Sequence, residues 1–202
     1  MGAHHHDLLA LGRELPFPIR GALGHSFGGK VSLALLARGV LPLDEVIVVD
    51  VDPANSTSRG PRDVEAVVET LCSLPRDYES RSAFTSALAA AGLGATMQAW
   101  LSMNLVRTDE GVRFGPDLEA IGALLESHRA TDLMDVSLNP PGETRLRFLA
   151  AGRSDAISEA SLTRLRGAAS EGTIEFEVVQ GAGHWVQVDA PEAVREFLAR
   201  QP

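Results

Sequence analysis

The chain has 202 residues, of which 45% are hydrophobic and 22% are charged, and its formal net charge is −9. This composition is typical of one globular domain with a sizeable core, and the acidic balance without a basic cluster argues against a nucleic-acid partner. No apolar run approaches the roughly 20 residues that a membrane span needs. A secretory signal is not expected either, because the first residues lack a basic start and an apolar core.

Neither the single cysteine nor the N-terminal histidines predict a disulfide or a metal site. Cys72 is the only cysteine, which excludes an internal disulfide and a cysteine-based metal site and fits a reducing, cytoplasmic setting. It lies in a stretch of helical periodicity, where we expect it to be a buried apolar residue. The histidines at 4–6 are adjacent and cannot all face one metal ion, so we expect no metal site there.

Strands and helices alternate along most of the chain. The predicted core elements are a short helix at 7–14, strands at 19–24 and 45–50 with a helix at 27–38 between them, strands at 144–150 and 173–179, and a helix at 191–200. The run at 45–50 is continuously β-branched, as in a parallel strand covered on both faces. The alternation predicts an α/β fold with a mostly parallel sheet.

The middle of the chain has a different character. Between about 63 and 139 the apolar residues recur at helical spacing, and no core strand is evident. We therefore expect a core formed by residues 1–62 and 140–202 and a helical insertion at 63–139. At this point of the chain, such an insertion would form a lid over the carboxyl ends of the strands. The simpler alternative is an ordinary pair of packing helices.

The sequence Gly-His-Ser-Phe-Gly at residues 24–28 has the form of a nucleophile elbow. The pattern places a serine on a tight turn between a strand and a helix, and the backbone of that turn requires small neighbours. An apolar strand is predicted before it and a helix after it, which five matching residues alone would not guarantee. We interpret Ser26 as a nucleophile and the backbone N–H of Phe27 as a donor of the oxyanion hole.

A serine nucleophile needs a base, because its free hydroxyl reacts poorly at neutral pH. In proteins with this elbow the order along the chain is nucleophile, acid and then a late histidine. His184 directly follows the last predicted strand, in a glycine-rich loop, and we interpret it as the base. His25 is expected to point elsewhere on the turn.

Two carboxylates compete for the third position. Asp155 follows the strand at 144–150 and precedes His184, which is the usual location of the acid. Asp50 ends the preceding strand, and its side chain could also reach the imidazole because neighbouring strand ends share one edge of the sheet. Position in the chain slightly favours Asp155, and both residues stay candidates.

Three runs, at residues 24–30, 48–53 and 181–186, are together similar to the small acyl-esterase branch of the α/β-hydrolases. They read Gly-His-Ser-Phe-Gly-Gly-Lys, Val-Val-Asp-Val-Asp-Pro and Gly-Ala-Gly-His-Trp-Val. That branch includes the bacterial YbfF-type esterases and mitochondrial abhydrolase-domain proteins. The resemblance implies a partial α/β-hydrolase fold with a lid, hydrolysis of short or medium acyl esters or thioesters without a cofactor, and Asp50 as the acid.

The resemblance also implies that strands are missing at the N-terminus. The fold normally supplies about four strands before the elbow, including a loop that completes the oxyanion hole. We therefore expect a truncated chain with a bare strand edge, poor stability, weak activity and a tendency to self-associate through that edge.

The leading hypothesis is a Ser-His-Asp hydrolase that acts on a small-molecule acyl ester or thioester. The alternative is a catalytically inactive relative that serves as a binding or scaffold protein. A serine at the elbow excludes the related dehalogenase and epoxide hydrolase chemistry, which requires aspartate there.

Overall fold

The computed structural model describes residues 10–56 and 62–200. The histidines at 4–6 and the first three residues of the helix expected at 7–14 lie outside these ranges, whereas 10–14 are helical. The chain divides into two compact units, one formed by Met1–Ser58 and Ser127–Pro202 and the other by Arg59–Glu126. Each unit is described by itself below.

The first unit contains a four-stranded parallel sheet, as the sequence predicts. Its strands are β1 (Gly21–His25), β2 (Glu45–Val49), β6 (Arg145–Ala151) and β7 (Glu175–Val179), in the spatial order β1-β2-β6-β7. Helix α2 (Phe27–Arg38) connects β1 to β2 and ends at Gly39, whose φ of 59° is the left-handed conformation common after a helix. The predicted α/β fold is confirmed.

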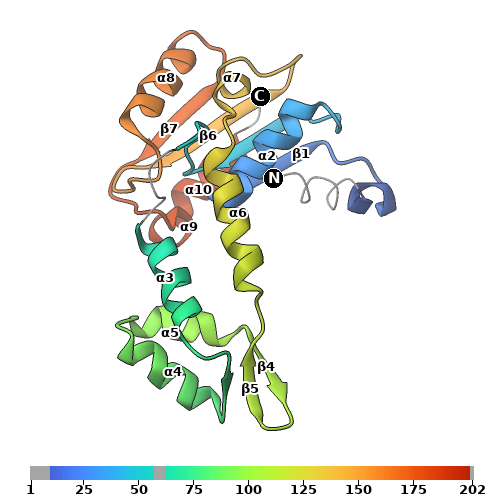
Figure 1. Ribbon diagram of the computed structural model, residues 1–202. Helices are drawn as coiled ribbons and strands as arrows, with labels where there is room; N and C mark the ends of the chain where they lie inside the picture. Colours follow the sequence, from blue (N-terminus) through green and yellow to red (C-terminus); the bar gives the residue numbers. More distant parts are fainter. Residues whose placement is uncertain (1–9, 57–61, 201–202) are drawn as a thin grey trace. The chain divides into compact units, whose positions relative to one another are not determined.

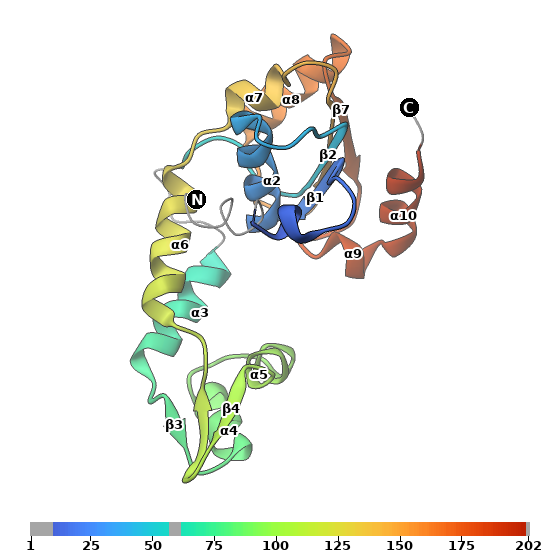
Figure 2. The same ribbon diagram turned by 90° about the vertical axis from the view of Figure 1, so that its right-hand side faces the viewer.

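Helices cover both faces of this sheet (Figures 1 and 2). Helix α2 packs on one face with α7 (Met134–Leu138) and α8 (Glu159–Ser170), while α9 (Val186–Asp189) and α10 (Pro191–Ala199) belong to the other. Side chains of β2 alternate between the faces. Val46 and Val48 join the core under α2, and Ile47 and Val49 join the core under α10. Two apolar cores therefore fix the sheet from opposite sides.

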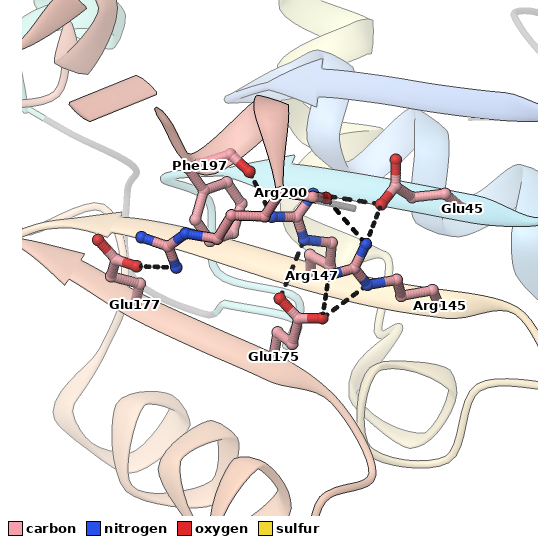
Figure 3. A network of polar contacts seen from close by, with 7 residues as sticks. All are labelled: Glu45, Arg145, Arg147, Glu175, Glu177, Phe197 and Arg200. Carbon is pink, nitrogen blue, oxygen red and sulfur yellow. Dashed lines mark hydrogen bonds and ion pairs between the residues drawn. The ribbon is translucent and has the colours of Figure 1, made fainter. Parts of the chain in front are cut away.

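The amino end of the sheet carries an ionic network around Arg147, which is completely buried (Figure 3). Its guanidinium contacts Glu45 at 3.2 Å and Glu175 at 3.1 Å, and it donates to the backbone carbonyl of Phe197 in α10. Arg145 contacts the same two carboxylates. The network joins three strands to the last helix.

Strand β1 forms one edge of the sheet and, among the described residues, pairs only with β2. Its Leu23 side chain is 55% exposed, on the same face as Ile47 of β2. An exposed apolar strand edge is a surface for pairing with another chain. Self-association through this edge stays a prediction.

The second unit is not purely helical, which corrects the sequence-based expectation. Its elements are α3 (Arg62–Ser73), β3 (Asp77–Tyr78), α4 (Arg81–Ala90), α5 (Ala95–Ser102), β4 (Leu105–Thr108), β5 (Gly111–Phe114) and α6 (Leu118–Ala130), the last of which continues into the first unit. The three strands form an antiparallel sheet in the order β3-β5-β4. A bidentate pair between Arg113 and Asp77, which lie opposite each other, links β5 to β3.

Two further expectations for this region differ from the structure. The second compact unit ends at Glu126, so residues 127–139, expected in the insertion, belong to the first unit. Cys72 is exposed and not buried, because the buried face of α3 is formed by Leu71 and its neighbours at helical spacing. A lid role for the second unit stays a prediction. None of the helices in the described ranges has the length and apolar character of a membrane span.

Candidate active site

Ser26 lies at the junction of β1 and α2, as the elbow pattern predicts. Its φ of 54° and ψ of −122° are a conformation that non-glycine residues rarely adopt. The strand pairing continues through it, since its N–H donates to the carbonyl of Val49 at 2.9 Å. The turn therefore stores backbone strain at the residue predicted to be the nucleophile, as functional sites often do.

The three glycines around Ser26 have different roles. A Cβ at Gly24 would lie 2.1 Å from the carbonyl oxygen of Gly28, a clash of backbone against side chain that cannot be relieved locally. A Cβ at Gly29 would lie 2.7 Å from Val51 Cγ1, so this residue permits the close approach of α2 to the sheet. A Cβ at Gly28 would meet nothing within 4 Å. The requirement for a small residue thus holds at Gly24 but not at Gly28.

His184 lies in the loop between β7 and α9, and its ring reaches Ser26. Its Nε2 is 3.0 Å from Ser26 Oγ. The Asp189 carboxylate stabilises this loop by accepting a hydrogen bond from the backbone N–H of Gly183 at 2.7 Å. The predicted nucleophile and base are therefore within hydrogen-bond distance although 158 residues separate them in sequence.

Asp50 supplies the third group. It follows β2, is 1% exposed and has a φ of 47°. Its Oδ2 is 2.8 Å from His184 Nδ1, and its Oδ1 accepts the backbone N–H of Ala151 at 2.9 Å. Because an ionised carboxylate only accepts, Nδ1 carries a proton and Nε2 is left to accept from the serine hydroxyl. Both carboxylate oxygens are thus fixed, and one of them selects the tautomer of His184.

Asp155 is not brought to the imidazole. It lies exposed in the loop after β6, and within the described ranges no contact joins it to His184. The two candidate acids therefore differ in placement: Asp50 is buried against the ring, and Asp155 faces solvent.

Phe27 begins helix α2, where backbone N–H groups point out of the helix and favour negative charge. Its ring stacks on His128, with 5.7 Å between ring centroids and 23° between planes. His128 lies in the last turn of α6, the part of that helix that belongs to the first unit. Phe27 is therefore the first residue of α2 after Ser26, and its ring is packed on His128.

His25 is a site residue that the sequence-based reasoning missed, because we expected it to point elsewhere. Its Nε2 donates to the backbone carbonyl of His184 at 2.7 Å, and its ring lies 4.7 Å from the His184 ring and 5.6 Å from that of Trp185. Burial, with a smaller contribution from the charge of His184, lowers the pKa of His25. His25 is thus a neutral donor that fixes the base loop, and its position at the end of a strand beside that loop was the only sequence signal.

Comparison with known proteins yields one family match and one curated relative. A model of the Alpha/beta hydrolase family matches residues 2–197. The sn-1-specific diacylglycerol lipase ABHD11 of Xenopus laevis is 26% identical over 172 residues, which are 83% of this chain and 53% of that protein. The chain thus spans about half the length of this curated relative.

Solved structures with the same fold include two hydrolases. A marine microorganism esterase has a TM-score of 0.78 and 18% identity, covering 98% of this chain and 76% of its own. An E-2-(acetamidomethylene)succinate hydrolase has a TM-score of 0.71 and 20% identity, covering 96% of this chain and 70% of its own. At these identities the likeness establishes the fold.

Proposed function

Because the chain belongs to the alpha/beta hydrolase family, we propose that it is a serine hydrolase that cleaves small acyl esters or thioesters. The observation that carries this proposal is the continuous chain of contacts from Ser26 Oγ through the His184 ring to Asp50, at 3.0 Å and 2.8 Å. These three side chains supply a nucleophile, a base and an orienting carboxylate. The reaction needs no cofactor.

The first half of the reaction forms an acyl-enzyme. Ser26 Oγ attacks the carbonyl carbon of the substrate while His184 Nε2 takes the hydroxyl proton. The negative charge that develops on the carbonyl oxygen lies at the start of α2, where the N–H of Phe27 stabilises it. The carbon–oxygen or carbon–sulfur bond then breaks, and the alcohol or thiol leaves with the proton from Nε2.

The second half repeats these roles with water. His184 Nε2 removes a proton from water, the hydroxide attacks the acyl carbon, and Ser26 leaves as it regains its proton. The products are a carboxylic acid and the free enzyme. Throughout, the Asp50 carboxylate stabilises the imidazolium that forms transiently on His184.

Apolar surface beside the base supports an acyl substrate. Trp185, which directly follows His184, is 54% exposed, and Val188, four residues after His184, is 70% exposed. Exposed apolar side chains next to a reactive centre favour contact with a hydrocarbon chain. The named activity of the Xenopus relative, a diacylglycerol lipase, concerns an acyl ester as well.

Covalent labelling tests the proposal directly. A fluorophosphonate probe should label wild-type protein at Ser26, and Ser26→Ala should remove both the label and hydrolysis of p-nitrophenyl acyl esters of increasing chain length. Ser170→Ala, an exposed serine at the end of α8, is the matched control and should label like wild type. Folded protein that neither labels nor hydrolyses any ester would favour the binding or scaffold function instead.

A further inference from the structure

Lys30 is the only lysine of the chain, since the rest of its 18 basic residues are arginines. It lies on α2, one turn after Ser26, and is 1% exposed. A lysine is almost never fully buried unless its ammonium is paired or hydrogen-bonded. The partners of this ammonium therefore indicate what it does.

The Lys30 ammonium bonds to two segments that are distant in sequence. Its Nζ donates to the backbone carbonyls of Ala54 and His128, each at 2.8 Å. Ala54 lies in the segment 51–56, which leads from β2 toward the second unit, and His128 lies in the segment 127–133, which leads back. We call these segments the outgoing and the returning connector. Both belong to the first unit.

The connectors are also joined to each other. The N–H of Ser56 donates to the carbonyl of Arg129 at 2.9 Å, and the N–H of Leu133 donates to the carbonyl of Pro53 at 2.8 Å. Among the described residues, however, only the Lys30 side chain hydrogen-bonds to both connectors and so joins them to α2, the helix that begins directly after Ser26.

Each connector also contributes a carboxylate to the surroundings of the ammonium. Burial lowers the pKa of Lys30 to about 8, and the charges of Asp52 on the outgoing connector and Asp132 on the returning one act in the opposite direction. Two carbonyls and two carboxylates, one of each from each connector, thus favour a protonated lysine at neutral pH. A compact ammonium carries three donors that can rotate to meet its partners, whereas the five donors of an arginine guanidinium are fixed in one plane.

We infer that Lys30 is a positioning residue whose ammonium fixes the outgoing and returning connectors to the helix that carries Ser26. The outgoing connector begins directly after Asp50, and the returning connector carries His128, whose ring stacks on Phe27. Fixing both connectors therefore fixes the surroundings of the acid and of the oxyanion donor. The effect on turnover rests on the proposed function, whereas the effect on the connectors does not.

Hydrogen exchange of Lys30→Met tests this role, because methionine has a similar length but no donor. Amides of residues 54–56 and 129–133 should exchange at least about tenfold faster than in wild type, while those of β6 and β7 stay unchanged. Arg38→Met, an exposed cation on the same helix, should change neither region. Unchanged exchange in the connectors, or a uniform increase across the sheet, would overturn the inference.

The single lysine allows a second measurement on wild-type protein. An amine-reactive acylating reagent should modify Lys30 at least about 100-fold more slowly in the native protein than in urea, because the amine is buried and bonded. Modification at the rate of an exposed lysine would contradict the inference even if Lys30→Met failed to fold.

Steady-state kinetics then separates positioning from general structure. In Lys30→Met we expect kcat to fall about tenfold with KM nearly unchanged, because the oxyanion donor acts in the transition state. The pH at which activity rises should stay the same, since Lys30 neither donates nor accepts a proton in the proposed reaction. A change in KM alone would exclude the positioning role, and if no variant hydrolyses any ester, the exchange and acylation results still decide the structural inference.

Discussion

The two ends of the central sheet both bury charged side chains, but they satisfy them in different ways. At the amino end, Arg147 is surrounded by carboxylates and a carbonyl in a network closed by Arg145. At the carboxyl end, Ser26 and Asp50 have positive φ angles, and His184 keeps 23% of its side chain exposed. The difference indicates that the amino end stabilises the fold, whereas the carboxyl end holds strained and partly solvated groups, as the proposed chemistry requires.

Replacing the carboxylate at the carboxyl end should give the largest effect on activity. Asp50→Asn can present its amide N–H₂ to His184 and so favour the wrong tautomer, and we expect kcat to fall about 10⁴-fold. The free energy of unfolding should change far less. Asp155→Asn is the matched control in the neighbouring loop and should stay within about twofold of wild type. An equal loss in both variants, measured with p-nitrophenyl esters, would contradict the assignment of Asp50.

Much of this site could be predicted from the sequence. Ser26 and His184 were identified because the elbow and the glycine-rich loop are local patterns next to strand ends, and these residues do meet. The choice between Asp50 and Asp155 could not be made from the residues alone, because both follow strands whose carboxyl ends share one edge. It depends on side-chain direction, which the left-handed backbone of Asp50 sets.

Adding a methyl group at the elbow should have the next largest effect, and it tests how tightly the strained turn at the carboxyl end of the sheet is packed. Gly24→Ala places its Cβ against the carbonyl of Gly28 and must displace the start of α2, so we expect a loss of about 3 kcal/mol or more in stability. Gly28→Ala has open space and should change stability by less than about 1 kcal/mol. Urea unfolding of the two variants measures the difference. Similar midpoints would show that the turn adjusts more easily than its geometry suggests.

At the amino end, removing the central cation should lower stability without affecting chemistry. Arg147→Met leaves Glu45 and Glu175 with one cationic partner fewer and removes the stack of the guanidinium on Phe197, at 4.3 Å. We expect a loss of about 2–3 kcal/mol in the free energy of unfolding, since the carboxylates keep Arg145 and some solvent. Activity per folded molecule should be unchanged. A fall in kcat at full folding would show that the two ends are coupled.

Features that depend on distant partners escaped sequence reasoning. Arg147 alternates with Leu146 and Phe148 in the strand pattern, but its partner Glu45 is 102 residues away. The strands of the second unit were missed for another reason. They have only two to four residues each, too short for a periodicity, and β3 exists because it pairs with β5.

The smallest expected effect, on the pH dependence of stability, concerns a buried nitrogen atom that makes no hydrogen bond. His128 Nε2 has no hydrogen-bond partner among the described residues, unlike the guanidinium of Arg147. Burial and, to a smaller extent, the positive charge of Lys30 lower the pKa of His128 to about 4. Since an unfolded histidine titrates near 6.5, the unfolded chain binds more protons between about pH 4 and 6.5. Stability is therefore fully present above this window and is lost as the pH falls through it.

His128→Phe should remove this acid sensitivity while keeping the stack on Phe27. Between pH 7 and 5 we expect the variant to lose about 1 kcal/mol less stability than wild type, a value reduced for the partial exposure of the ring. At pH 7 it should be at least as stable, because it no longer buries an unpaired nitrogen. Burial also lowers the pKa of His25, which contributes to the pH dependence of both proteins. Parallel stability curves for the two proteins would mean that His128 is solvated, and that the carboxyl end satisfies its buried polar groups as completely as the amino end does.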